Sequence, residues 1–238
     1  MVIAVILARR GSKRIAHKNR RVLAGHPLVV WTLEAARQSK ADRIVTSSDD
    51  EEILDMAEEF GFAVERPPEL AGDHVPDAPA IRHALEAIQP SGYGSDDLVL
   101  HLRPTAPFRT PEEINTVAEL LRRFPCDSII SVRPAMEHPK KAYVETGEMV
   151  GILPELVPYA GSSALGDPSQ GLPQVWHAAG FIDAARIDRF THEGRMDCGL
   201  VLGWPAPVER ALDLDEEADW IRAEALAQQH GWKPGNLL

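Results

Sequence analysis

The sequence has little of several features that mark whole classes of protein. Only two of the 238 residues are cysteine, Cys126 and Cys198, and neither stands in a C-x-x-C pair or a zinc-ligand spacing, so we expect two reduced thiols that are at least half-buried. Aromatic residues make up 6%, which weakly disfavours a protein that stacks single-stranded bases on aromatic rings. The longest apolar run, residues 2–8, is followed by Arg9 and Arg10. It is too short to cross a membrane, and its charges stand on the wrong side for a signal peptide. We therefore expect a cytoplasmic protein without a membrane partner.

Positive charge is also scarce. The chain has 25 Lys and Arg against 36 Asp and Glu, which gives a formal net charge of −11. Such a chain has no general attraction for nucleic acid, so none is expected as a partner, and an anion site must gather its basic residues locally. Hydrophobic residues make up 44% and charged residues 26%. This composition is typical of a globular chain with a sizeable core, in one large domain or one domain with an insertion.

Strand-like and helix-like segments alternate along most of the chain. Short aliphatic runs predict buried strands at 2–7, 43–46, 98–102, 128–132 and 198–202. Amphipathic segments between and after them predict helices at about 27–39, 50–60, 79–88, 111–124 and 216–229. Ser48 or Asp49 is the expected N-cap of the second helix. This βαβ rhythm predicts an α/β fold with a mostly parallel, Rossmann-like sheet.

The rhythm stops in the middle of the chain. Residues 134–180 are rich in Pro, Gly and Ser and have no strong period. We interpret this segment as an inserted arm, which leaves residues 1–133 and 181–238 as the main domain.

The residues that follow the first strand are unusually basic. Ala8-Arg9-Arg10-Gly11-Ser12-Lys13-Arg14 is followed by Lys18-Asn19-Arg20-Arg21. Ligand sites of open parallel sheets lie beyond the carboxyl ends of the strands, and here cations and the amides of a Gly-Ser turn converge in a way that suits phosphate groups. The spacing is neither that of a Walker loop nor that of the G-x-G-x-x-G turn. In an otherwise acidic protein, the run favours an oligophosphate site over a solvated basic loop.

Two further segments carry polar side chains after predicted strands. Two prolines stiffen the loop 103–109, which presents Arg103 and Thr105 to the same edge. Near the end of the chain, Asp213-Leu214-Asp215 places two carboxylates on one face of an extended segment. Mg²⁺ prefers a few carboxylates together with shared phosphate oxygens, so a magnesium site is predicted. The alternative is an N-cap for the last helix, a role that Asp215 can combine with metal binding.

Taken in order, these segments resemble one family, the CMP-sugar-acid cytidylyltransferases, which includes the CMP-sialic, CMP-legionaminic, CMP-pseudaminic and CMP-Kdo synthetases. The resemblance extends from residue 2 to about residue 226 and rests on residues 8–14, 18–19, 47–53, 66–71, 103–109, 138–141, 170–173 and 213–215.

The resemblance implies a nucleotidyltransferase-type fold, transfer of CMP from CTP to an acidic acceptor, and Mg²⁺ as the cofactor. It assigns CTP binding to Ala8, Arg9, Gly11, Ser12, Lys13, Lys18, Asn19, Arg66 and Thr105. It assigns acceptor binding to Arg103, Lys141, Gln170 and His177. Catalysis is assigned to Arg9, Lys18, Asp213 and Asp215, the last two as the metal ligands. Residues 134–180 resemble the arm through which these enzymes form homodimers, so a homodimer is expected.

The acceptor side departs from the sialate pattern. Arg103 stands where sialate enzymes usually have Gln, Ser169 and His177 stand where they have Arg, and Ala179 stands where they have Asn. The segment 177–180 looks more like the pseudaminate branch. The expected acceptor is therefore a bacterial nonulosonic acid, a nine-carbon keto-sugar acid.

Two alternatives remain open from the sequence. A phosphonate is the alternative acceptor, because Arg103, Arg133, Lys140 and Lys141 suit a compact dianion better than a polyol. The alternative from another class is a nucleotide-binding homologue that kept the fold and lost turnover.

Overall fold

Two units make up the part of the chain that the computed structural model describes, residues 1–162 and 164–237. The first unit comprises Met1–Val132 and Ala179–Leu238, and the second comprises Arg133–Ala178. Within the described residues, no helix is long and apolar enough to cross a membrane.

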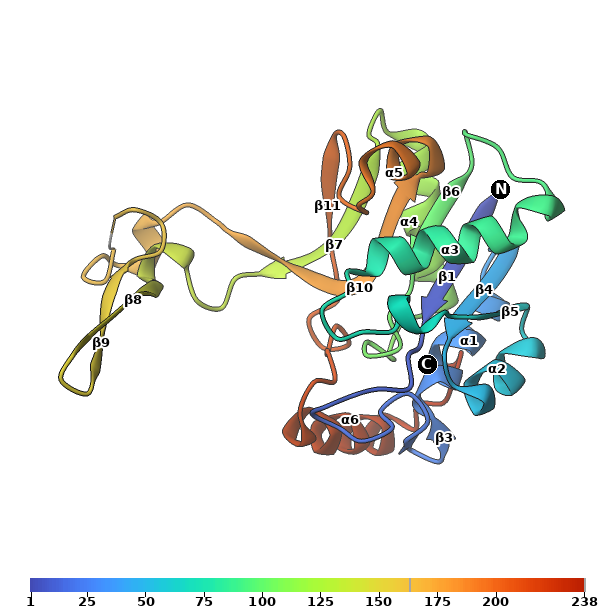
Figure 1. Cartoon of the computed structure of the whole chain (residues 1–238), viewed down its shortest axis with the longest axis horizontal. Helices are drawn as coiled ribbons and strands as arrows, with labels where there is room; N and C mark the ends of the chain where they lie inside the picture. Colours follow the sequence, from blue (N-terminus) through green and yellow to red (C-terminus); the bar gives the residue numbers. More distant parts are fainter. Residues whose placement is uncertain (163, 238) are drawn as a thin grey trace. The chain divides into compact units, whose positions relative to one another are not determined.

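A seven-stranded sheet forms the centre of the first unit, in the order β11-β7-β10-β6-β1-β4-β5 (Figure 1). Its strands are β1 (Val2–Leu7), β4 (Arg43–Ser48), β5 (Phe62–Glu65), β6 (Leu98–His101), β7 (Ser128–Pro134), β10 (Trp176–Arg186) and β11 (Val201–Pro205). β1 pairs in parallel with β4 and β6, and β7 pairs in parallel with β11, whereas β10 runs antiparallel to β6. The predicted mostly parallel α/β sheet is thus confirmed.

Helices cover both faces of this sheet. They are α1 (Leu28–Gln38), α2 (Glu51–Glu58), α3 (Asp77–Ile88), α4 (Pro111–Arg123), α5 (Ile187–Glu193) and α6 (Glu217–His230). β1 shows why both faces are covered, because Ala4 and Ile6 pack in one core with α1, α2 and α4, while Ile3 and Val5 pack in another with α3 and α5. A third core joins α6 to the basic segment, as we call residues 8–21, and includes Ile15 of that segment. Short elements complete the unit: β2 (Val22–Leu23), β3 (His26–Pro27) and the 3-10 turns η1 (Pro68–Leu70) and η2 (Gln89–Ser91).

The structure corrects two predicted helix caps. The N-cap of α2 is Asp50, whose side chain accepts a hydrogen bond from Glu52 N at 3.2 Å, and neither Ser48 nor Asp49 has that role. Ser48 instead donates its hydroxyl to the carbonyl oxygen of Ala8 at 2.6 Å, which ties β4 to the basic segment. The N-cap of α6 is Glu216, in a capping box with Asp219, so the predicted capping role of Asp215 was wrong.

The predicted strand 198–202 was wrong by three residues, since β11 begins at Val201. Gly199 forms a turn there with a φ of 56°, and a Cβ at this position would collide with the Asp127 carboxylate. Asp127 in turn accepts a hydrogen bond from Leu200 N at 2.8 Å. Cys198 is buried in this turn rather than in a strand, and Cys126 is buried as expected.

The sequence also missed β5 and β10. β10 lies between β7 and β6 in the sheet, but Gly180 and Asp183 interrupt its apolar residues. Gly180 has a φ of 60°, and the next two amides, of Phe181 and Ile182, both donate to the hydroxyl of Ser131, at 2.9 and 3.0 Å. A side chain of β7 thus takes the place of a regular ladder contact.

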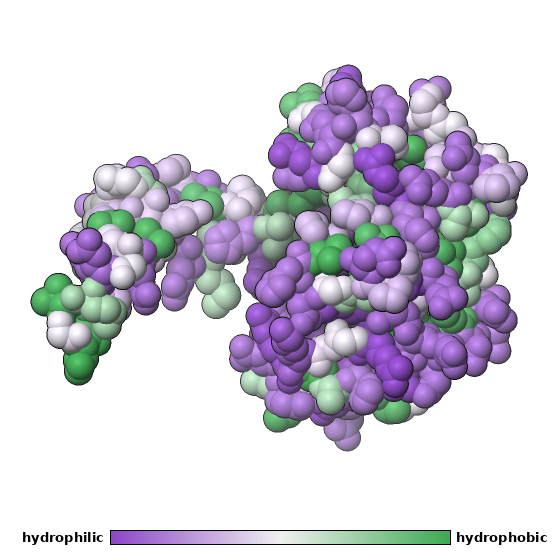
Figure 2. Space-filling model, viewed as in Figure 1, coloured by the Kyte–Doolittle hydropathy of each residue, from purple (hydrophilic) through white to green (hydrophobic). Residues whose placement is uncertain are grey.

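The second unit contains an antiparallel hairpin of β8 (Tyr143–Val150) and β9 (Leu153–Pro158), together with the 3-10 turns η3 (Pro139–Lys141) and η4 (Ser169–Gly171). The sequence predicted an inserted arm here, without a strong period and without named strands. Every residue of β8 is exposed, and hydrophobic residues gather at the turn end of the hairpin, shown in green in Figure 2. The exposed large apolar side chains of the second unit are Met136, Tyr143, Val144, Met149, Val150, Ile152, Leu153, Leu156, Val157, Tyr159, Leu165 and Trp176.

Candidate active site

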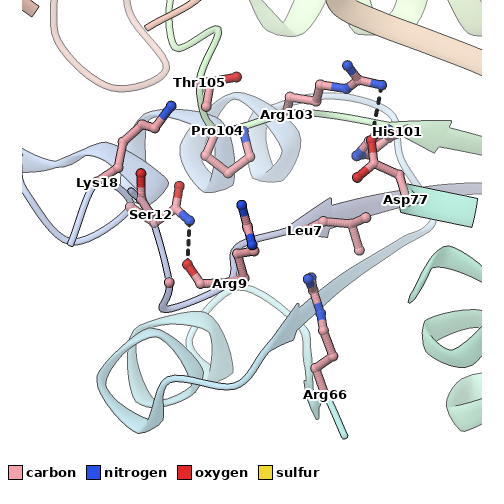
Figure 3. A pocket seen from close by; sticks show the side chains of 12 residues that line it. Leu7, Arg9, Ser12, Lys18, Arg66, Asp77, His101, Arg103, Pro104 and Thr105 are labelled. Carbon is pink, nitrogen blue, oxygen red and sulfur yellow. Dashed lines mark hydrogen bonds and ion pairs between the residues drawn. The ribbon is translucent and has the colours of Figure 1, made fainter. Parts of the chain in front are cut away.

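A cavity of about 200 Å³ opens where β1 and β6 end (Figure 3). It is lined by Leu7, Arg9, Gly11, Ser12, Lys18, Asn19, Arg66, Asp77, His101, Arg103, Pro104 and Thr105. Leu7 is the last residue of β1 and His101 is the last residue of β6. This is the edge of a parallel sheet at which ligands bind, and most of the residues predicted to bind CTP meet there.

The basic segment forms one wall of the cavity because a few of its residues are anchored. Ile15 is 1% exposed and packs in the core next to α6. Asn19 donates its side-chain amide to the carbonyl oxygen of Arg9 at 2.9 Å and accepts from Val29 N at 3.0 Å. The bond between Asn19 and Arg9 bends the segment back on itself, so Arg9 and Lys18 line the same cavity.

Most cations of this wall are paired with carboxylates. Asp73 bridges Arg9 Nη1 and Lys13 Nζ, at 2.5 and 2.7 Å. The hydrogen bonds from Lys13 and Arg9 hold the pKa of Asp73 below its usual value. Lys13 is mostly exposed and is not a lining residue, and Ala8 is fully buried with its amide bonded to Ser47 O at 3.0 Å.

Arg66 is a fixed guanidinium in the cavity. It is 5% exposed, and it donates Nε to the hydroxyl and Nη2 to the carbonyl oxygen of Ser47, at 3.0 and 2.7 Å. Burial lowers the pKa of Arg66 from its usual value. Ser47 lies near the carboxyl end of β4, so this strand determines where the guanidinium stands.

A polar cluster on the other side of the cavity was only partly predicted. Arg103 Nη2 lies 3.1 Å from Asp77 Oδ2 and 3.8 Å from Asp183 Oδ2. His101 is 2% exposed, and its Nδ1 lies 4.0 Å from Asp77 Oδ2. Burial, and then the charge of Arg103, lowers the pKa of His101 to about 3, so the ring is neutral at neutral pH. One signal in the sequence could have identified it: His101 is the only polar residue of β6 and stands at its carboxyl end.

The predicted metal pair lies beside this cavity. Leu214 N donates to Thr105 O at 2.8 Å, which holds the segment 213–215 against a lining residue. Asp213 accepts a side-chain hydrogen bond from Thr105, and burial, reinforced by the charge of Asp215, raises the pKa of Asp213. Its Oδ1 is buried and has no hydrogen-bond partner among the residues that the structure describes.

Unlike Asp213, Asp215 is paired with two cations. Its carboxylate lies 3.0 Å from Lys18 Nζ and 2.8 Å from Arg14 Nη1. Burial acts to raise the pKa of Asp215, but the hydrogen bond and charge of Lys18, together with Arg14, outweigh it and lower the pKa. Lys18 also donates to Leu214 O at 2.6 Å. In the described part of the chain, no group of three or more His, Cys, Asp or Glu side chains is placed to hold a metal ion, so phosphate oxygens would have to complete a site built on Asp213 and Asp215.

The remaining predicted acceptor residues belong to the second unit. Lys141 ends η3, Gln170 lies in η4 and His177 lies in the part of β10 that belongs to this unit. They are not among the residues that line the cavity.

The sequence of this chain is similar to those of several known proteins. Residues 3–150 match the family model described as cytidylyltransferase. The chain is 39% identical to the CMP-N,N'-diacetyllegionaminic acid synthase of Legionella pneumophila over 136 residues, which are 56% of this chain and 58% of that protein. It is 36% identical to the N-acylneuraminate cytidylyltransferase of Escherichia coli over 137 residues, 55% of this chain and 31% of that protein. The matched segment thus covers less than two thirds of either relative.

A solved structure has a similar fold over nearly the whole chain. The structure of CMP:2-keto-3-deoxy-manno-octonic acid synthetase complexed with CTP matches with a TM-score of 0.63 and 17% identity, over 96% of this chain and 98% of that one. At this identity the similarity concerns the fold alone.

Proposed function

Because its residues 3–150 match the family model, this chain belongs to the cytidylyltransferase family, and on that premise we propose that it transfers CMP from CTP to a nonulosonic acid and releases pyrophosphate. The observation that carries the proposal is the composition of the cavity. Its lining includes Arg9, Lys18 and Arg66 together with Gly11 and Ser12, and Arg103 lines it next to Asp77 and His101. The cations suit the triphosphate, and a guanidinium suits the carboxylate of a sugar acid.

The reaction needs little covalent chemistry from the protein. A hydroxyl oxygen of the acceptor attacks the α-phosphorus of CTP, the bond between the α-phosphorus and the bridging oxygen breaks, and pyrophosphate leaves while the hydroxyl proton passes to a base or to water. Catalysis in such a transfer is mainly positioning and charge neutralisation. Arg9 and Lys18 are proposed to supply both, since they line the cavity and their ion pairs with Asp73 and Asp215 are open to exchange for phosphate oxygens.

Mg²⁺ is the proposed cofactor. The donor set fits a hard cation, because Asp213 Oδ1 is buried without a hydrogen-bond partner in the described structure and a second carboxylate, Asp215, lies close by. Asp213 and Asp215 would hold the ion, which when bound neutralises charge on the phosphates.

The direct test is pyrophosphate release from CTP and Mg²⁺ with a panel of acids. We expect release with keto-sugar acids, a preference for CTP over UTP and ATP, and a loss of at least about 100-fold in kcat/KM for Lys18→Gln. Lys40→Gln is the matched control, because Lys40 is paired with Glu119 outside the cavity. Equal turnover with UTP contradicts the base preference. Tight CTP binding without release for any acid supports a silent nucleotide-binding homologue instead.

We also propose that the second unit mediates a homodimer and contributes Lys141, Gln170 and His177 to acceptor binding. The exposed apolar side chains of β8 and β9 support this, since an exposed patch of apolar side chains usually marks an interaction surface. Sedimentation equilibrium is expected to give a dimer at micromolar concentration, and Ile152→Asp at the hairpin turn is expected to give a monomer. A wild-type monomer contradicts the proposal. The cytoplasmic location stays a prediction.

A further inference from the structure

Arg103 does not offer a free positive charge to the cavity. Its Nη2 atom lies 3.1 Å from the Asp77 carboxylate and 3.8 Å from that of Asp183, as Figure 3 shows for Asp77. The backbone holds the residue in place as well, because Arg103 O accepts Nη2 of Arg109 at 2.6 Å. On the side of β10, a Cβ at Gly180 would already touch Arg103 Nη1 at 3.4 Å. The guanidinium is therefore held between two carboxylates.

The other cations that act on these carboxylates, Arg66 and Arg109, donate their hydrogen bonds to other groups. His101 is neutral, buried and without a hydrogen-bond partner at Nδ1 among the described residues. Asp183 accepts from the amide and hydroxyl of Ser131, both at 3.2 Å, and its burial raises its pKa. Asp77, the first residue of α3, is half exposed. Asp77 is therefore the carboxylate that lies nearer to Arg103 and also lines the cavity.

We propose that Asp77 is a specificity-determining residue, which neutralises part of the Arg103 charge so that the cavity accepts an acid with one negative charge and rejects a doubly charged one. This inference rests on the proposed function. A carboxylate brings one negative charge to Arg103. Because Asp77 neutralises only part of the Arg103 charge, the guanidinium can still bind this one charge. A phosphonate brings a second charge within a few ångströms of Asp77, where like charges repel in a partly desolvated site. Taken alone, Arg103 had suggested the opposite preference.

The test compares the two classes of acid on wild type and Asp77→Asn, at pH 8.5, where both charges of a phosphonate are present. The probes are N-acetylneuraminate as the singly charged acceptor and 2-hydroxyethylphosphonate as the doubly charged competitor. We expect Asp77→Asn to lower the inhibition constant of the phosphonate by about tenfold, the size of one partly screened charge contact. Asp55→Asn, an exposed carboxylate on α2 outside the cavity, is the matched control.

A double-mutant cycle connects the effect to Arg103. In an Arg103→Gln background, Asp77→Asn should change the selectivity by less than about twofold, because the guanidinium that it modulates is gone. Asp77→Ser, with melting temperatures for all variants, replaces Asp77→Asn if the latter does not fold. The inference is overturned if wild type prefers the phosphonate, if Asp77→Asn changes both acids equally, or if Asp55→Asn has the same effect. Failure of the proposed function looks different, since wild type then releases no pyrophosphate with any acid of either class.

Discussion

Burial of His101 predicts a specific loss of stability in acid. Its side chain is 1% exposed, and burial together with the charge of Arg103 lowers the pKa of His101 from 6.5 to about 3. Unfolding returns the ring to water, so between about pH 6.5 and pH 3 the unfolded chain binds a proton that the folded chain does not. The stability contributed by the neutral ring is fully present above pH 6.5. It is lost as the pH falls, by at most about 1.4 kcal/mol per pH unit.

We expect His101→Leu to remove this dependence. Leucine has a similar volume, does not titrate, and leaves no unpartnered Nδ1 in the interior. Between pH 7.0 and pH 5.0, the wild-type free energy of unfolding should fall by about 2 kcal/mol more than that of the variant, since the interval includes about 1.5 units below pH 6.5. Urea denaturation at both pH values measures this difference, and the other titrating groups cancel because both proteins have them. Exposed His192→Gln is the control, and parallel pH dependences for wild type and His101→Leu would refute the reasoning.

Two further predictions concern the charges around the cavity. Asp73→Asn should tighten the binding of CTP and of pyrophosphate about three- to tenfold in calorimetry, because Arg9 and Lys13 lose the carboxylate that they share; unchanged or weaker binding, or an equal gain in Asp55→Asn, contradicts this. Asp213→Asn should lower turnover at least about 100-fold, or ~2.7 kcal/mol of transition-state stabilisation, with little change in melting temperature, because its Oδ1 has no partner to lose in the described structure. Near-normal turnover at saturating Mg²⁺ would remove the metal assignment.

The sequence predicted those elements whose signals are local. Helix α4 was expected at 111–124 and is observed at Pro111–Arg123, because Pro111 occupies its first position and Thr110 and Glu113 form a capping box. The alternation of such helices with aliphatic strands was enough for the α/β class. The position of β10 in the sheet depends instead on contacts across some fifty residues, such as those of the Ser131 hydroxyl with Phe181 and Ile182. No local pattern encodes a contact of that kind.

The same distinction explains the outcome for the site. The wall formed by Arg9, Lys18 and Asn19 was predictable, because one continuous basic run follows a buried strand. The opposite cluster was not, because Asp77 begins a helix, His101 ends a strand, and only the fold brings them together. The sequence indicated Arg103 but not its ion pair with Asp77. Arg103 was therefore taken as a free positive charge, and a dianionic phosphonate stayed open as an alternative acceptor.

The excess of acidic residues in this chain helps to order the basic segment before a nucleotide binds. Four cations of the basic segment are bound to carboxylates far along the sequence: Arg9 to Asp73 at a separation of 64 residues, Arg14 and Lys18 to Asp215 at 201 and 197, and Arg21 to Glu217 at 196. Such partly exposed ion pairs contribute only about 0–1 kcal/mol each, whereas charge-assisted hydrogen bonds to a phosphate contribute about 1.5–3 kcal/mol. The pairs are therefore strong enough in number to order the segment and weak enough singly for a triphosphate to replace them. A chain with fewer carboxylates would leave the seven neighbouring cations to repel one another, and the segment would have to be ordered by the nucleotide itself, at a cost in affinity.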